Sequence, residues 1–464
     1  MRYRLDPSVE FLHGGRALLG GDPTKLLRLS EAGGALVARW RREGCDPAGP
    51  AERKLVDRLV GAAMAHPVPD LEDRSLPAVI VPVRDRPDAL ERCLAALVAS
   101  GPTRIIVVDD GSIDPSAHAV VAERHGAAVV RRAISGGPAA ARMTGWRALE
   151  PRPMLVAFVD SDIEVSPDCW TALVGHFSDH ACGLVAPRVA HRTGPGLIDR
   201  FEAANSPLDL GPDPAPIRAG TRVSYVPAAA LVVRAEAFEE VSGFDEALDV
   251  GEDVDLVWRL AEAGWRCRYE PASVVTHVGR PALGPMLRRR FDYGRSAAVL
   301  DARHPGALPP VRGSAWSAAV LTAVAAGRPV VAAGLTGWTV RAMAQRLGEV
   351  PDAWRLSARL VLRGHVGFAR QLARAVIRPW FPITLALGLV SRRVRRLAAV
   401  AAVVHPLLTW RERRPALPLP AWVALGLADD VAYSAGVWAG CVAARRLGPL
   451  RPEFSQRSPD GPKG

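Results

Sequence analysis

The sequence lacks the paired cysteines that a zinc ribbon or a disulfide framework requires. Its 464 residues contain six cysteines, and no two of them form a Cys-x-x-Cys pair. This scatter argues against a structural zinc site and favours a reducing compartment. No apolar run of the secretory type follows the first residues. We therefore expect no secretory signal, and we expect the main domain to face the cytoplasm.

Sequence signatures of several common enzyme classes are also missing. The chain has no Gly-x-Ser-x-Gly nucleophile elbow, no His-Glu-x-x-His zinc helix and no Gly-x-x-x-x-Gly-Lys-[Ser/Thr] phosphate loop. The Gly-x-Gly-x-x-Gly dinucleotide fingerprint is absent as well. These absences weigh against elbow-type serine hydrolases, zinc proteases, P-loop nucleotidases and dinucleotide-dependent oxidoreductases.

Lysine is scarce, and nearly all of the basic charge comes from arginine. The net charge is +11, and 49% of the residues are hydrophobic, enough for a sizeable core. Arginine favours contacts with phosphates and carboxylates, so an acidic partner such as a nucleotide or an anionic membrane surface suits this balance. A plain bias towards arginine and alanine would produce the same balance. No recurring pattern of basic and aromatic residues is present, and we expect no nucleic-acid partner.

The strongest local signal is an apolar run that ends in two carboxylates. Residues 155–159 (LVAFV) precede Asp160 and Asp162. Such a run predicts a strand buried on both faces, and ligands of open α/β sheets bind just beyond the carboxyl ends of the strands. Two oxygen ligands at this place suit Mg²⁺ or Mn²⁺ that also contacts phosphate groups. A solvated turn after a strand is the simpler alternative.

The hydrophobic pattern from residue 78 to residue 159 predicts alternating strands and helices. The expected strands are 78–83, 104–108, 127–130 and 154–159, and the expected helices are 87–99, 114–125 and 136–149. This alternation predicts an α/β fold with a parallel-rich central sheet. Two further acidic pairs lie at element ends. Asp109 and Asp110 follow a strand, whereas Glu252 and Asp253 open a helix, where the helix dipole favours carboxylates.

The chain divides into three predicted parts. Residues 1–75 read as a small domain with a β-hairpin and helices, residues 76–300 as the α/β domain, and residues 301–464 as a helical, apolar region. Inside the α/β domain, residues 190–222 are rich in Pro, Gly and Asp and predict one long loop.

Charged residues interrupt each of the three apolar stretches of the C-terminal region, which are 315–340, 381–404 and 419–443. A charge at the centre of a bilayer is costly, so we expect these helices to lie in or on a membrane surface and not to span it. Packed soluble helices are the alternative.

Residues 78–280 resemble the family 2 inverting glycosyltransferases, which have the GT-A fold. The resemblance rests on the segments VIVPVRDRPDALERCLAAL, IIVVDDGSID, GGPAAARMTGW, FVDSD and GFDEALDVGEDVDLVWRLAEAGW. The complete layout, with the N-terminal domain and the apolar C-terminal part, is most similar to the mycofactocin-system glycosyltransferases. Residues 1–75 resemble the small winged-helix peptide-recognition domains of ribosomal-peptide maturation systems, and a plain packing domain is the alternative.

The resemblance implies a role for each candidate site residue. It places six residues at the nucleotide-sugar donor: Pro82, Arg84, Asp109, Asp110, Arg142 and Asp160. It makes Asp162 and His277 the metal ligands. Asp253 becomes the general base that takes the acceptor proton, and Glu252 orients the acceptor or the base. Ordinary surface positions are the alternative for Arg84, Arg142 and His277.

The function that the resemblance implies is transfer of a sugar, expected to be glucose from UDP-glucose, to a peptide-derived redox cofactor of the mycofactocin type. The transfer would proceed with inversion and use Mg²⁺ or Mn²⁺. The QxxRW motif of the processive synthases in this family is missing, which weighs against long-chain polymer synthesis. We expect the protein at the cytoplasmic face of the cell membrane.

Two alternatives remain open at this point. One is a membrane-associated glycosyltransferase that acts on a lipid or cell-wall glycan acceptor. The other is a non-catalytic protein that captures a peptide, and the complete set of Asp109, Asp162 and Asp253 disfavours it.

Overall fold

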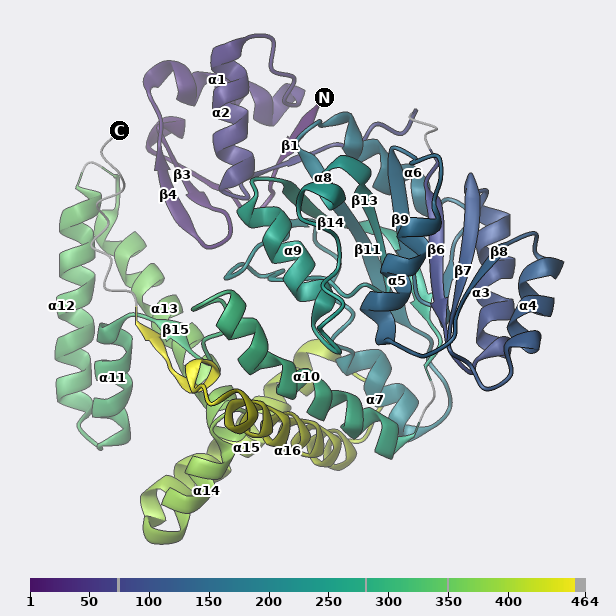
Figure 1. Ribbon diagram of the computed structural model, residues 1–464. Helices are drawn as coiled ribbons and strands as arrows, with labels where there is room; N and C mark the ends of the chain where they lie inside the picture. The colour runs from purple at the N-terminus through teal and green to yellow at the C-terminus, as the bar shows by residue number, and fades with distance from the viewer. Residues whose placement is uncertain (73–75, 280–281, 349, 455–464) are drawn as a thin grey trace. The chain divides into compact units, whose positions relative to one another are not determined.

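The computed structural model describes residues 1–72, 76–279, 282–348 and 350–454 (Figure 1). The chain forms two compact units, residues 1–281 and residues 282–464. The sequence analysis places the boundary after residue 300, whereas helix α10 (Leu283–Arg303) belongs to the second unit. The reason is packing: Ala297 and Ala298 of α10 share a core with Val437 and Cys441 of helix α16 (Leu419–Ala444).

The first unit begins with a small domain of strands and helices. Strands β2 (Glu10–Leu12), β3 (Ala17–Gly20) and β4 (Lys25–Arg28) form an antiparallel sheet. Helices α1 (Glu31–Glu43) and α2 (Pro50–Gly61) follow, and β1 (Tyr3–Leu5) pairs with β5 (Ala65–Pro67). The elements enclose a core of their own, which includes Leu18, Val37, Trp40, Leu59 and Met64.

A nine-stranded sheet forms the centre of the first unit. Its strand order is β10-β14-β11-β13-β9-β6-β7-β8, and β12 pairs with β14. The bounds are β6 (Ala78–Val83), β7 (Arg104–Asp110), β8 (Ala128–Arg132), β9 (Leu155–Val159), β10 (Ile163–Val165), β11 (Cys182–His191), β12 (Ala215–Pro216), β13 (Ala230–Arg234) and β14 (Arg266–His277). Parallel pairing joins β8, β7, β6 and β9, and also β11 and β14, while β13 runs antiparallel to both β9 and β11. Six strands therefore point the same way, which confirms the predicted α/β fold.

Helices cover both faces of this sheet, because successive side chains of a strand point to opposite faces. Val79 and Val81 of β6 share one core with residues of α3 (Pro87–Ser100), α4 (Pro115–Arg124) and α6 (Cys169–Gly175). Ile80 points to the other face, towards α5 (Gly137–Ala148). A Cβ atom on Gly145 of α5 would lie 2.5 Å from Ile80 Cγ2, so glycine lets this helix approach the sheet closely. Phe158 packs on that face too, beside Phe238 of α8 (Ala235–Glu240).

The prediction of one long loop over residues 190–222 is wrong. This segment contains helix α7 (Leu197–Asn205) and strand β12. The backbone N–H of Gly196 donates to Asp199 Oδ2 at 3.2 Å and closes the first turn of α7, while Phe201 is completely buried. The Pro and Gly residues on either side dominate the composition and conceal this short helix.

The second unit is helical. After α10 it contains α11 (Ala315–Ala325), α12 (Pro329–Leu347), α13 (Ala353–Ile377), α14 (Phe381–Val390), α15 (Arg392–Arg413) and α16. The short strands β15 (Arg312–Gly313) and β16 (Glu453–Phe454) pair in parallel. No single helix in the described part of the chain has the length and hydropathy of a membrane span, although α13 and α14, bent by 83°, pass that test together.

Candidate functional site

The candidate residues gather at one edge of the central sheet. Strands β7, β9 and β14 point the same way, so Asp109, Asp160 and His277 at or just past their carboxyl ends lie along the same edge. Strand β13 runs the opposite way, so the segment before it reaches this edge, where the N–H of Asp160 donates to Ala229 O at 2.9 Å. Helix α9 (Glu252–Glu262) begins here as well. The chain turns here, since the N–H of Ile163 donates to Asp160 O at 3.0 Å, and Asp160 is partly exposed.

Arg142 is the buried centre of the site. Its side chain projects from α5, and the residue is 2% exposed. Nη1 donates to Glu252 Oε1 at 2.7 Å, and Nη2 donates to Asp160 Oδ1 at 2.6 Å. Burial by itself lowers the pKa of Arg142, but the two carboxylates outweigh burial and hold the pKa above its ordinary value. Arg142 is thus no surface arginine.

Glu252 and Asp253 differ in what they contact. Glu252 is buried, and burial followed by the charge of Asp253 raises its pKa to about 7. Asp253 is half-buried, and its two oxygens accept hydrogen bonds from the backbone: Oδ2 from Ala228 N at 3.1 Å and Oδ1 from Val254 N at 2.8 Å. Burial raises the pKa of Asp253 as well, against the lowering effect of these two donors. Asp253 is therefore held in place by backbone groups, while Glu252 is committed to Arg142.

Asp109 and Asp110, adjacent in the sequence, have different surroundings. Asp109 Oδ1 accepts from Ser112 N at 3.0 Å, whereas its buried Oδ2 has no hydrogen-bond partner within the described residues. A buried carboxylate oxygen without a partner is costly and suits a ligand that donates to it. Asp110 accepts from Ser135 Oγ at 2.6 Å and from the N–H groups of Gly136 at 3.0 Å and Gly137 at 2.9 Å. Asp110, expected at the donor, thus fixes the loop that leads into α5.

The structure places Asp162 and His277, the two expected metal ligands, next to each other. His277 Nε2 lies 3.6 Å from Asp162 Oδ2, and β10 and β14 bring the two residues together by antiparallel pairing. One carboxylate and one imidazole fit a divalent cation whose remaining ligands come from diphosphate and water. No group of three His, Cys, Asp or Glu side chains that could hold a metal occurs among the described residues.

Pro82 and Arg84 lie next to this edge but are less buried. Pro82 is opposite Val108 in the pairing of β6 with β7. Arg84 follows β6, its side chain is 56% exposed, and Nη1 donates to Ser135 Oγ at 3.1 Å. Ser135 in turn donates to Asp110, so Arg84 extends the group of residues that shapes this loop.

Two residues of the site were not predicted. Arg86 Nη1 lies 2.9 Å from Asp162 Oδ2, and His191 Nδ1 lies 3.2 Å from His277 Nδ1. The motif VPVRDRPD contains both Arg84 and Arg86, but it gives no reason to prefer the second. His191 ends β11 and pairs in register with His277 of β14. The signal available was that a histidine ends each of two apolar strands.

Comparison with known proteins decides the family. The model of glycosyl transferase family 2 matches residues 78–239. A pre-mycofactocin glycosyltransferase of Mycobacterium tuberculosis is 39% identical over 469 residues, which cover 97% of this chain and 97% of that protein. This chain belongs to glycosyl transferase family 2. The family 2 assignment and the GT-A-type sheet confirm what the sequence motifs imply, and they make this protein an enzyme that transfers glycosyl groups.

Other relatives of this family 2 glycosyltransferase are more distant. An N-acetylglucosaminyltransferase of Rhizobium leguminosarum bv. viciae is 28% identical over 50% of this chain and 58% of its own. The crystal structure of S. aureus TarS residues 1–349 has 15% identity and a TM-score of 0.38, and the match covers 75% of this chain and 90% of that one.

Replacement of Arg142 by leucine should destabilise the first unit severely. The change leaves Glu252 buried and Asp160 partly buried without their cation, which costs roughly 3–5 kcal/mol. Arg147→Leu on the same helix is the matched control, because its pair with Glu246 is 57% and 36% exposed and contributes only about 0–1 kcal/mol. Urea unfolding of both variants measures the difference. Equal losses in the two variants would show that Arg142 does not hold the site together.

Proposed function

We propose that this enzyme transfers glucose from UDP-glucose to a peptide-derived redox cofactor of the mycofactocin type, with inversion at the anomeric carbon. The observation that carries the proposal is the end-to-end match to a pre-mycofactocin glycosyltransferase, which spans the N-terminal domain, the sheet and the helical unit. A direct test incubates the purified protein with UDP-glucose and that acceptor and follows the addition of hexose by mass spectrometry. An acceptor of unchanged mass would refute the proposal.

The donor would bind along the edge where β7 and β9 end. Asp109 supports this placement, because its buried Oδ2 has no hydrogen-bond partner among the described residues and could accept a hydrogen bond from the N–H of a nucleobase. Arg84 is exposed beside the same loop and supplies positive charge for the nucleotide phosphates. Asp160, held by Arg142, is 35% exposed and can accept from a ribose or sugar hydroxyl. These residues bind and orient the donor.

Asp162 and His277 would hold a divalent cation, Mg²⁺ or Mn²⁺. Such a cation, when bound, offsets the negative charge that develops on the departing diphosphate. Arg86, paired with Asp162, adds a second positive group at the same position. The pairing of β10 with β14 holds His277, at the end of β14, beside Asp162, which directly precedes β10, and this supports a site formed before the donor arrives.

Asp253 would act as the general base. The backbone N–H groups of Ala228 and Val254 fix its carboxylate, and the residue is accessible where Glu252 is not. The acceptor hydroxyl gives its proton to Asp253 while its oxygen attacks the anomeric carbon, and UDP leaves from the opposite side. One displacement of this kind inverts the configuration. Glu252 keeps Arg142 in place and stays out of the proton transfer.

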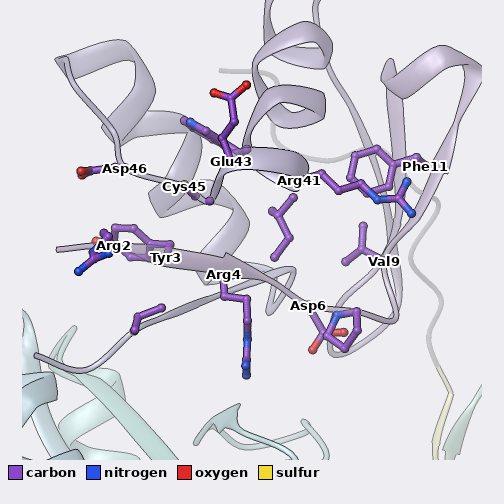
Figure 2. Close-up of a pocket in the computed structure, with 15 residues that line it drawn as sticks. Arg2, Tyr3, Arg4, Asp6, Val9, Phe11, Arg41, Glu43, Cys45 and Asp46 are labelled. Carbon is purple, nitrogen blue, oxygen red and sulfur yellow. The ribbon is translucent and has the colours of Figure 1, made fainter. Parts of the chain in front are cut away.

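The N-terminal domain would bind the peptide part of the acceptor. A cavity of about 600 Å³ opens in this domain (Figure 2). Figure 2 shows Arg41 and Phe11 at one end and Arg2, Tyr3 and Asp46 at the other. Apolar residues Leu5, Val9 and Trp40 also line the cavity. The lining also contains three arginines and the carboxylates of Asp6, Glu43 and Asp46, so the cavity suits a peptide segment with apolar side chains and charges of both signs.

The backbone of β1 supports an extended ligand in this cavity. Tyr3 exchanges two hydrogen bonds with Cys45, at 2.7 and 3.2 Å, on the side of β1 that faces away from β5. Because backbone groups alternate in direction along a strand, the next residue to face that side is Leu5, at the cavity. A peptide could pair with Leu5 and continue the strand beyond Cys45.

The alternative acceptor, a lipid or cell-wall glycan, draws support from the apolar surface of the second unit. The curated relative that matches the whole chain does not favour it. Extraction separates the two possibilities, since a peptide-derived product stays in the aqueous phase and a lipid-linked product does not.

Asp253→Asn should abolish transfer and leave UDP-glucose binding intact. The amide keeps the shape of the carboxylate but cannot accept the proton, and loss of a general base costs about 10²–10⁴-fold in kcat. A discontinuous assay of product formation measures kcat, and isothermal titration calorimetry measures the Kd for UDP-glucose. Near-normal turnover of Asp253→Asn would remove Asp253 from the role of base.

Glu252→Gln is the matched variant and reports on pH. The base works when deprotonated, so activity falls as pH drops through the raised pKa of Asp253. Arg142 lowers the pKa of Asp253, and in Glu252→Gln this cation has one carboxylate partner fewer, so its effect on Asp253 should grow and the acid limb of the kcat/KM profile should move to lower pH. A limb that stays in place would mean that another group controls it.

Chelation by EDTA should abolish transfer, and Mn²⁺ or Mg²⁺ should restore it. Calorimetric titration with UDP gives a readout that does not depend on turnover: Mn²⁺ should strengthen UDP binding to the native protein and have no such effect on Asp162→Ala or His277→Ala. His125→Ala, whose imidazole pairs with Glu91 on the outer helices, is the control and should behave like the native protein. Full activity of a protein confirmed to be metal-free would exclude the cation.

Val68→Glu should raise the KM for the acceptor about tenfold, since it places a charge in the wall of the cavity and opposes apolar contacts worth about 1.4 kcal/mol. The kcat and the KM for UDP-glucose should not change. Leu71→Glu is the matched control, because Leu71 is an exposed apolar residue three positions on that does not line the cavity. Equal acceptor KM values for both variants would leave the domain with a packing role only.

A further inference from the structure

Helix α14 is unusual because it has no charged residue and almost no burial. Its sequence is FPITLALGLV, and Gly388 is its one buried residue. Leu389 is 77% exposed and Val390 is 84% exposed, and Ile383, Leu385 and Leu387 are exposed as well. Apolar residues therefore cover the helix on all sides and not along one stripe. A helix that packs into a protein groove needs one apolar face only.

A cluster of arginines follows this helix directly. Ser391 separates α14 from α15, which opens with Arg392, Arg393, Arg395 and Arg396, all exposed. The side chain of Ser391 accepts from Val394 N at 3.4 Å and caps α15, while Arg395 Nη1 donates to Gly388 O at 3.1 Å. These contacts fasten α14 to α15, so the apolar helix and its basic neighbour form one hairpin.

The charge of the chain is divided between its two units. Residues 282–464 contain 27 Lys and Arg against 9 Asp and Glu, a net charge of +18. The whole chain carries +11, so residues 1–281 carry a net charge of −7. The basic unit also exposes Trp316, Trp338 and Trp354, and tryptophan is enriched where membranes meet water. Apolar side chains and positive charge thus occur together in the second unit.

We propose that the α14–α15 hairpin docks this enzyme on an anionic lipid surface, with α14 in the boundary between headgroups and acyl chains and the arginines of α15 at the lipid phosphates. Ten residues of helix are roughly 15 Å long, about half of a hydrocarbon core, so α14 enters one leaflet. Lipid surrounds an inserted helix on every exposed side, which accounts for its uniform apolar surface. In a cell the matching surface is the anionic cytoplasmic leaflet. The inference does not depend on the acceptor.

The test is flotation of the full-length protein with vesicles of phosphatidylcholine, alone or mixed with phosphatidylglycerol. The native protein should float with the anionic vesicles and much less with the neutral ones, and high salt should release a large share. Replacing Leu389 and Val390 together by glutamate should weaken vesicle affinity roughly 100-fold, since each apolar side chain then stays out of the lipid. Val120→Glu, an exposed valine on α4, is the matched control and should float like the native protein.

The arginines are tested separately. The triple variant Arg392→Gln, Arg393→Gln and Arg396→Gln should lose roughly 100-fold in affinity for anionic vesicles. Each arginine removed should lower the affinity about fivefold. Arg411→Gln, Arg413→Gln and Arg414→Gln remove the same charge at the other end of α15 and should lose far less. Transfer activity in vesicle-free buffer should be the same in all variants and shows that they fold.

Three outcomes would overturn the proposal. One is a full-length protein that does not float with anionic vesicles at low salt. The second is equal flotation of the α14 variant and the native protein. The third is a self-associating protein, detected by light scattering, in which the Leu389 and Val390 changes release monomers, because α14 would then bind a second copy of the chain.

Discussion

The candidate active site depends on one buried arginine side chain between two carboxylates that are 92 residues apart in the chain. Arg142 cannot be buried at reasonable cost unless Asp160 and Glu252 both reach it. This requirement ties α5, the end of β9 and the start of α9 together. Asp253 follows Glu252 in the chain, so the contact of Glu252 with Arg142 also helps to place Asp253. In the same way, Asp160 lies two residues before Asp162. A single guanidinium group therefore sets the arrangement of the proposed base and the proposed metal ligands.

Much of the fold and part of this arrangement could be predicted from the sequence. Apolar runs that alternate with amphipathic segments dictate βαβ units, and the motifs place acidic residues at the ends of those runs. Local patterns say nothing about which side chains meet across the sheet. They give Arg142 no partner. They also do not separate Asp109, whose Oδ2 has no partner in the part of the chain that the structure describes, from Asp110, which accepts hydrogen bonds from the Ser135–Gly137 loop. Helix α7 was not predicted because its nine residues lie between stretches rich in Pro and Gly, and these stretches dominate the composition of the segment.

The chain combines three surfaces of different chemistry. The edge with the candidate site carries carboxylates in a unit of net negative charge, the N-terminal cavity is lined by apolar residues and by charges of both signs, and the helical unit is strongly basic. An acidic sugar nucleotide must approach a site rich in carboxylates, so the local cations Arg84, Arg86 and Arg142 offset an unfavourable field. The excess positive charge of the second unit is not needed for that chemistry, which is why it calls for a separate explanation.

The contact between His191 and His277 has a further consequence. For two neutral imidazoles whose Nδ1 atoms are 3.2 Å apart, a hydrogen bond requires one Nδ1 to carry a proton and the other to accept it. If His277 keeps this proton, its Nε2 turns a lone pair towards Asp162; if His191 keeps it, His277 Nε2 carries a hydrogen and donates to the carboxylate instead. The choice of tautomer at His191, a residue that no motif marks, decides whether His277 is a ligand or a hydrogen-bond donor. The two strand ends thus have two tautomeric arrangements, which interconvert by proton exchange at both rings, and one of them suits the proposed cation.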